Sequence, residues 1–264
     1  MNRIDKKFKE LRVEGKKAFI PFLTAGYPDL LTTERLVLEF EKNGADMIEL
    51  GVPFSDPIAD GPVIQMSSYE ALKKGVSLRK VLGLVARLRK KTQIPLAAMS
   101  YYNPILSYGP ARFVRDAVNK GLDAVIVPDL PPEEEVDFSK IAARHGLEII
   151  LFISPTTTLA RSRWIAHQAC GFIYFVSLTG VTGARKSLPQ ELKSQLSAVK
   201  KIAGKIPVCA GFGVSSLKQV RFVSSVCDGV IVGSAIIKKI SENLSRPDLV
   251  KVVGSFVKRL KGRG

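Results

Sequence analysis

The stretch from residue 49 to residue 65 combines carboxylates with prolines and glycines, which suits proton-transfer chemistry. Glu49 ends an apolar run, where a carboxylate loses hydration and its pKa rises toward the range useful for acid–base catalysis. Asp56 and Asp60 follow in the loop, where acids can simply cap turns. Glu49 can equally be a buried structural carboxylate paired with a backbone or basic group, so both roles stay open.

Glycines late in the chain have the chemistry of an anion site. They occur in Gly180-Val181-Thr182-Gly183, Gly211-Phe212-Gly213 and Gly233-Ser234. Glycine lets the backbone approach an anion closely, and amides at a following helix N-terminus add donors and a favourable dipole. The same glycines can instead serve only tight turns.

The residue types needed for metal sites and catalytic triads are scarce. Cys170, Cys209 and Cys227 lack metal-ligand spacing, and we interpret all three as reduced, buried thiols. His145 and His167 fall in helical segments, so we expect them on helix surfaces. The sequence therefore predicts no metal site.

Apolar runs alternate with amphipathic segments, as a parallel sheet or barrel requires. Eight runs are expected to be strands, at 18–23, 47–50, 95–100, 124–127, 148–153, 172–176, 207–210 and 229–232. Helices are expected between them, at 31–43, 78–91, 111–120, 133–145, 159–169, 190–202 and 216–225. This pattern predicts the α/β class and a single (β/α)8 TIM barrel domain over residues 1–264.

The predicted barrel places the candidate residues at one end. Loops after the strands form the catalytic face of such barrels, and phosphate is usually bound after the last strands. Glu49 lies at the end of the second strand, and the glycines follow the sixth, seventh and eighth. An extra N-terminal helix, with Ile4, Phe8 and Leu11 on one face, is expected to cover the opposite end.

Composition and charge restrict the class of partner. The net charge of +16 raises nucleic acid, an acidic partner or an anionic substrate as possibilities. The basic residues are scattered along helical faces without interleaved aromatics, which favours a solvated surface over nucleic-acid binding. Because no apolar run could span a bilayer and the first residues lack a signal-peptide pattern, we expect a cytoplasmic protein without membrane contact.

The segment from Glu49 to Gln65 resembles the signature of the tryptophan synthase α-subunit family. The resemblance continues through residues 22–29, 101–105, 128–131, 180–183 and 211–214, and so covers essentially the whole chain. It departs from the family pattern only slightly, at 67–70 and at Cys209-Ala210. The resemblance implies a carbon–carbon lyase of tryptophan biosynthesis, which cleaves indole-3-glycerol phosphate to indole and glyceraldehyde-3-phosphate by a retro-aldol step.

The resemblance also implies a role for individual residues. Glu49 matches the proton-transfer carboxylate, and Asp60 matches a second catalytic carboxylate that accepts a hydrogen bond from the indole N–H. Tyr174 matches a tyrosine close to the reacting centre, although it can equally be a barrel-filling aromatic. The substrate-binding positions are Phe22, Tyr101 and Phe212 on the indole side, Thr182 in a closing loop, and Gly183, Gly211, Gly213, Gly233 and Ser234 on the phosphate side.

The resemblance implies no cofactor for this chain, since pyridoxal phosphate would belong to a β subunit, and it implies that β subunit as partner in an α2β2 heterotetramer. Proline-bearing loops at 53–57, 103–104 and 128–132 resemble the contact loops, and 180–189 resembles a flexible lid. Two other interpretations remain. Another phosphate-binding barrel enzyme would share the glycines without needing residues 49–65, and a non-catalytic barrel would tolerate loss of Glu49 or Asp60.

Overall fold

Eight parallel strands close into a barrel in the order of the chain, which confirms the predicted TIM barrel. The computed structural model describes residues 1–134, 136–176, 190–211 and 213–262. The strands are β1 (Ala18–Thr24), β2 (Ile48–Gly51), β3 (Leu96–Met99), β4 (Ala124–Ile126), β5 (Glu148–Ile153), β6 (Ile173–Val176), β7 (Val208–Gly211) and β8 (Gly229–Val232). Each expected strand is present, with ends shifted by at most one residue.

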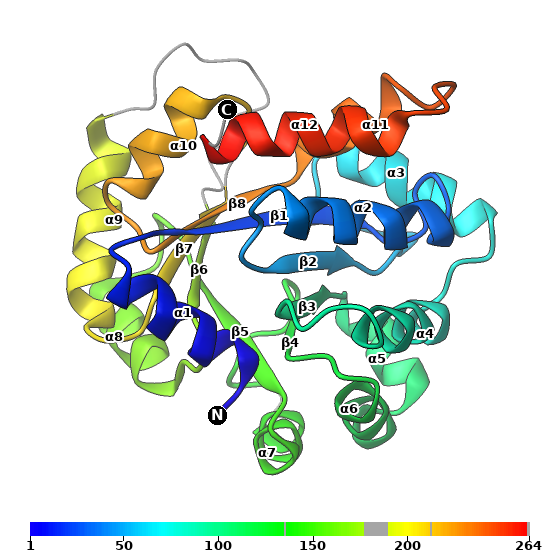
Figure 1. The fold of residues 1–264 in the computed structure, drawn as a ribbon. Helices are drawn as coiled ribbons and strands as arrows, with labels where there is room; N and C mark the ends of the chain where they lie inside the picture. Colours follow the sequence, from blue (N-terminus) through cyan, green and yellow to red (C-terminus); the bar gives the residue numbers. More distant parts are fainter. Residues whose placement is uncertain (135, 177–189, 212, 263–264) are drawn as a thin grey trace.

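Helices cover the outside of this barrel (Figure 1). They are α1 (Arg3–Val13), α2 (Leu30–Lys42), α3 (Pro62–Lys73), α4 (Leu78–Arg89), α5 (Tyr102–Tyr108), α6 (Pro110–Asn119), α7 (Val136–His145), α8 (Leu159–Gln168), α9 (Gln190–Ala203), α10 (Leu217–Ser224), α11 (Ser234–Ser241) and α12 (Leu249–Lys261). The sequence interpretation missed α3, α5, α11 and α12. Among the residues that the structure describes, no helix has the length and apolar character needed to cross a membrane.

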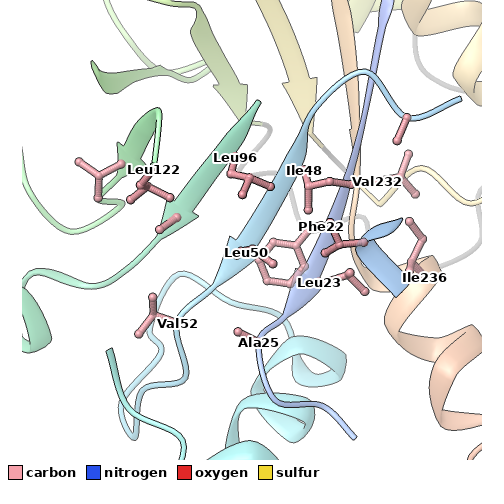
Figure 2. Packing of buried hydrophobic residues seen from close by; sticks show 14 of the residues in the cluster. Phe22, Leu23, Ala25, Ile48, Leu50, Val52, Leu96, Leu122, Val232 and Ile236 are labelled. Atoms are coloured by element: carbon pink, nitrogen blue, oxygen red, sulfur yellow. The ribbon is translucent and has the colours of Figure 1, made fainter. Parts of the chain in front are cut away.

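Alternate residues of each strand face the barrel interior and the helices. Part of the outward cluster is visible in Figure 2, which shows Ile48, Leu50 and Leu96 on β2 and β3 and Leu23 on β1, while Val232 and Ile236 belong to β8 and α11. The interior cluster comprises Ile4, Phe8, Leu11, Ala18, Ile20, Met47, Ala97, Ala124, Ile126, Ile150, Phe172, Tyr174, Cys209 and Ile231. Fully burying one large side chain of this kind stabilises the fold by roughly 1.5–3 kcal/mol.

Helix α1 packs against the amino-terminal end of the barrel, as the sequence predicts. Ile4, Phe8 and Leu11 are all buried, and the Phe8 ring lies 5.9 Å from that of Phe172 inside the barrel. Asp123, just before β4, accepts hydrogen bonds from Arg3 of α1 and from Arg89 of α4, at 3.0 and 2.6 Å. The buried carboxylate of Asp123 therefore links α1 and α4 to the start of β4.

The cysteine prediction is only partly correct. Cys209 and Cys227 are buried free thiols, but Cys170 is exposed. Cys170 lies in the short turn between α8 and β6, beside the positive-φ Gly171, and this turn runs over the surface. The histidines lie where predicted, exposed at or near the C-terminal ends of α7 and α8.

Glu148, the first residue of β5, is a buried carboxyl group at the amino-terminal end of the barrel, which α1 covers. It is 8% exposed, and its Oε2 atom receives no hydrogen bond from a described residue. Burial raises the pKa of Glu148 to about 8, and the nearby carboxylates of Asp5 and Asp123 add to the rise. Glu148 is therefore mostly protonated at neutral pH. Ionising it in the folded protein costs free energy.

We expect Glu148→Gln to stabilise the protein increasingly from about pH 4.5 to about pH 8. The native carboxyl binds a proton that the unfolded chain releases in this window, so wild-type stability declines as the pH rises. Glutamine cannot ionise, and the gain should reach on the order of a few kcal/mol near pH 8. Urea unfolding across this range measures it, with Glu191→Gln on the surface of α9 as control. A constant difference between Glu148→Gln and wild type at all pH values would contradict the account.

Candidate active site

A cavity of about 660 Å³ opens at the carboxyl ends of the strands. This is the end where TIM barrels place their active sites. Its lining residues are Phe22, Glu49, Ile58, Ala59, Asp60, Gly61, Ile64, Met99, Pro128, Phe152, Ser154, Thr157, Tyr174, Val176, Gly211, Gly213, Ile231, Gly233 and Ser234. The cavity thus brings together most of the described residues that the sequence analysis selects.

Glu49 projects from the middle of β2, where its neighbours in register are Phe22 of β1 and Ala97 of β3. It is 1% exposed, and neither carboxyl oxygen has a hydrogen-bond partner among the described residues. Burial, and to a smaller extent the charge of Asp60, raise the pKa of Glu49 to about 8. The side chain is therefore a protonated acid at neutral pH, and it lines the cavity.

Asp60 faces the same cavity from the loop between β2 and α3, and it is half-buried. The Tyr101 hydroxyl donates a hydrogen bond to Asp60 Oδ2 at 3.1 Å and accepts one from the Ala59 N–H at 2.9 Å. Burial raises the pKa of Asp60 to about 6, and the bond from Tyr101 opposes that rise. At neutral pH Asp60 is therefore mostly ionised, while Glu49 is mostly neutral.

Tyr101 supports the loop and does not line the cavity. It is 3% exposed and stacks on Phe54, with ring centroids 5.2 Å apart. Gln65 of α3 donates a second bond to this loop, from Nε2 to the Asp60 carbonyl oxygen at 2.9 Å. Tyr101, which follows β3, thus holds the carboxylate of Asp60, and Gln65, which follows β2, holds its backbone.

Two glycines make room for the aromatic residues of the cavity. A Cβ atom on Gly211 would lie 2.6 Å from the Tyr174 hydroxyl, and one on Gly51 would lie 2.5 Å from Phe22 Cζ. Tyr174 is 9% exposed and packs on Phe152 at 5.0 Å between ring centroids. Burial raises the pKa of Tyr174 well above its ordinary range, so its hydroxyl remains a neutral donor.

The opposite side of the cavity presents backbone groups suited to an anion. Gly233 is the N-cap of α11, and no side chain caps that N-terminus. The first amides of α11, beginning at Ser234, therefore lack intrahelical partners and lie at the positive end of the helix dipole. Gly213 adopts a φ of +44°, a backbone conformation that glycine tolerates best. Thr182, Gly183 and Phe212 lie outside the described residues.

Several lining residues were not predicted. Met99 ends β3, and Pro128, Ser154 and Thr157 follow β4 and β5. Their position at or after a strand end was a usable signal, since that is where barrel loops meet. Phe152 and Ile231 face inward from within strands, and their selection needs the register of the closed barrel. Among the described residues, no group of three or more metal-ligating side chains is arranged to hold a metal ion.

Comparison with known proteins gives concordant matches over nearly the full chain. A family model described as "Tryptophan synthase alpha chain" matches residues 8–259. A relative of that name from Geotalea daltonii is 49% identical over 261 residues, covering 99% of this chain and 98% of the relative. The crystal structure of a tryptophan synthase alpha chain from Legionella pneumophila is 38% identical, with a TM-score of 0.92, covering 99% of this chain and 97% of that one.

A further solved structure carries information about assembly. It concerns the "mutual activation of the tryptophan synthase a2b2 complex" from Pyrococcus furiosus, and its matching chain is 38% identical with a TM-score of 0.86. The alignment covers 93% of this chain and 98% of that one. This chain is therefore similar to a protein that is described as part of a larger complex.

Proposed function

Because this chain belongs to the tryptophan synthase alpha chain family and is thus a lyase of tryptophan biosynthesis acting on indole-3-glycerol phosphate, we propose that Glu49 and Asp60 carry out its chemistry. The observation that supports this assignment is the difference in pKa between two carboxyl groups that line the same cavity. The pKa of Glu49 is raised to about 8 and that of Asp60 to about 6. Pairs of titratable groups whose pKa values are pushed apart are typical of acid and base partners.

The cleavage needs a proton at indole C3 and the removal of one from the adjacent glycerol hydroxyl. In our proposal, neutral Glu49 gives its proton to C3, which leaves a cationic indolenine and an ionised Glu49. Ionised Asp60 accepts a hydrogen bond from the indolenine N–H and stabilises its positive charge. Ionised Glu49 then takes the hydroxyl proton, the C–C bond breaks, and its electron pair neutralises the ring to give indole and the aldehyde. Glu49 ends in its starting state.

The aromatic side chains of the cavity are proposed to hold the indole ring. Phe22 and Tyr174 line the cavity on the β1 and β6 sides, where Gly51 and Gly211 leave room for their rings. Every step of the cleavage is a proton transfer or a bond rearrangement within the substrate, without net oxidation or reduction. We therefore propose that this chain needs no cofactor, which removal of metals by exhaustive chelation before the assay would test.

The phosphate group of the substrate is proposed to lie against the backbone of Gly211, Gly213, Gly233 and Ser234, with Thr182 and Gly183 of the 180–189 segment completing the site. The uncapped N-terminus of α11 gives the strongest support, because its free amides and dipole attract an anion. A structure with substrate or inorganic phosphate would test this placement. An anion bound elsewhere on the catalytic face would contradict it.

We expect Gly213→Asp to raise the KM for indole-3-glycerol phosphate about tenfold or more, which corresponds to roughly 1.4 kcal/mol. The added carboxylate would crowd and repel the phosphate. Gly204→Asp is the matched control, since Gly204 is exposed, also has positive φ, and lies in the turn between α9 and β7 with no atom near a new Cβ. Equal effects of the two substitutions on KM, or loss of the thermal unfolding transition, would contradict a specific role for Gly213.

A β subunit is proposed as the partner, in an α2β2 assembly. The similarity to the chain from the Pyrococcus furiosus complex supports a partner of this kind. Exposed apolar side chains follow three neighbouring strands: Ile58 after β2, Leu106 after β3 and Val136 after β4, with exposures of 82%, 55% and 50%. We propose the loops that carry these three side chains as the contact surface for the β subunit. We also propose that residues 1–264 form one domain.

Mixing the chain with the β subunit from the same genome should give a stable complex and a faster release of indole. The expected cause is that docking closes the 180–189 segment over Glu49 and Asp60 and excludes water. Mass determination in solution and an indole assay on the same sample measure both effects. A stable complex without a change in rate would contradict the closure, and absence of a complex would contradict the partnership.

A further inference from the structure

The order of the strands gives the catalytic cavity two ends. In a closed barrel of eight strands, the ends of β7 and β8 lie across the mouth from those of β3 and β4. Gly213 and Gly233 line the cavity at the first end, where we place the phosphate of the substrate. Glu49 of β2 lies between the two ends. A substrate with its phosphate at the first end and its C3 atom at Glu49 therefore extends its benzene ring toward the ends of β3, β4 and β5.

Three side chains form the wall of the cavity at that second end. They are Met99 at the end of β3, Pro128 after β4 and Phe152 of β5. Met99 and Phe152 both pack on the interior cluster of the barrel. Ser154 and Thr157 also line the cavity after β5, but their hydroxyl oxygens lie 3.1 Å apart and hydrogen-bond to each other. The groups that meet the benzene ring are therefore mainly apolar, and they act on it by their size.

Phe152 is the larger of the two long side chains in this wall. Its ring packs on that of Tyr174, with centroids 5.0 Å apart. Tyr174 in turn contacts the backbone of β7, since a Cβ atom on Gly211 would lie only 2.6 Å from its hydroxyl. Met99 is different, because an unbranched thioether side chain adapts its shape easily. Phe152 is therefore the side chain that yields less to a larger ring.

We propose that Phe152, assisted by Met99, determines the specificity of the cleavage by restricting it to indole rings without a substituent at C5 or C6. These two carbons form the edge of the ring farthest from the glycerol chain, so a substituent on them meets the wall first. A difference of one methylene group in an apolar pocket changes kcat/KM by about 10- to 200-fold. The inference rests on the proposed function, because the phosphate and Glu49 set the direction of the substrate.

Indole-3-glycerol phosphate with a methyl group at C5 or C6 tests the proposal. The wild-type chain should cleave either compound with a kcat/KM at least about tenfold below that of the unsubstituted substrate. Phe152→Leu should reduce this discrimination by about tenfold, and Met99→Ala should reduce it less. Phe172→Leu is the matched control, since Phe172 lies deeper in the barrel, against Phe8 of α1. It should lower the thermal stability without changing the discrimination.

Equal kcat/KM values for the methylated and unsubstituted substrates in wild type would overturn the proposal. A folded Phe152→Leu variant with unchanged discrimination would do the same, and Met99→Ala gives this answer if Phe152→Leu does not fold.

A binding measurement separates this proposal from the proposed function. The probe is a substrate analogue in which a propyl chain replaces the glycerol, so that it keeps the phosphate but cannot be cleaved. Calorimetry should show that wild type binds the analogue at least about tenfold more weakly when C5 carries a methyl group, and that Phe152→Leu largely removes this difference. Equal binding of both analogues by wild type would refute the role of Phe152. The expected binding difference in a chain that cleaves no substrate would instead refute only the proposed function.

Discussion

Replacing Glu49 by glutamine is expected to reduce indole release from indole-3-glycerol phosphate by about 10²- to 10⁴-fold, the usual contribution of a positioned acid–base group. The amide keeps the shape of the side chain but has no acidic proton for C3 and cannot accept the hydroxyl proton. The fold should persist, because neither Glu49 oxygen receives a hydrogen bond from a described residue. A steady-state indole assay with both proteins at equal concentration measures the loss.

Glu148→Gln is the matched control for this experiment. Glu148 is also a buried carboxyl group with a pKa raised to about 8, but it lies at the opposite end of the barrel, beside α1. Its substitution should leave the rate of indole release unchanged. Near-wild-type activity of Glu49→Gln would remove Glu49 from the chemistry, and equal losses from both substitutions would point to a general effect on the barrel.

Asp60→Asn should be nearly as damaging, with a loss of well over tenfold in indole release. The asparagine can still accept the hydrogen bond from Tyr101, so the loop should keep its position. What disappears is the negative charge that faces the developing indolenine cation, and a neutral dipole stabilises that cation less. Asp56→Asn, exposed in the same loop, controls for the change of charge on the protein surface.

A loss well below tenfold, worth less than about 1.4 kcal/mol, would mean that Asp60 serves the loop and not the chemistry. Tyr101→Phe separates these two roles further. It removes the bond that lowers the pKa of Asp60, so it should narrow the active pH range at the acidic side while leaving the carboxylate in place. A comparable loss for Tyr101→Phe and Asp60→Asn at high pH would show that loop position dominates.

The fold could be predicted from the sequence because the strand and the helix of each βα unit have different local patterns of apolar residues. The β-strands are short apolar runs, and the helices between them carry periodic apolar positions, so all eight strands were located. Two of the four missed helices, α3 and α5, lack such a signal. Helix α5 buries only Ile105, and α3 begins at Pro62 directly after a loop rich in proline and glycine. Helices α11 and α12 do carry periodic apolar positions and were predictable, since they bury Ile236, Ile237 and Ile240 in α11 and Leu249, Val253, Val257 and Leu260 in α12.

The candidate site was predictable to the extent that single residues carry a signal. Glu49 is conspicuous as a carboxylate in an apolar strand, and its burial follows from that context. The support of Asp60 by Tyr101 is different, because the two residues are 41 positions apart and meet only when the loops after β2 and β3 converge. The exposed position of Cys170 likewise depends on the turn before β6 and not on its apolar neighbours.

The pH dependence of kcat/KM for indole release tests most directly whether Glu49 and Asp60 perform the proton transfers. The reactive form should have Asp60 ionised and Glu49 protonated, so kcat/KM should fall below about pH 6 and above about pH 8. In Asp60→Asn the acidic limb should vanish, and the alkaline limb should move to lower pH because the charge that raises the pKa of Glu49 is gone. A wild-type kcat/KM that rises through pH 8, or that is constant from about pH 5 to pH 9, would contradict the assignment.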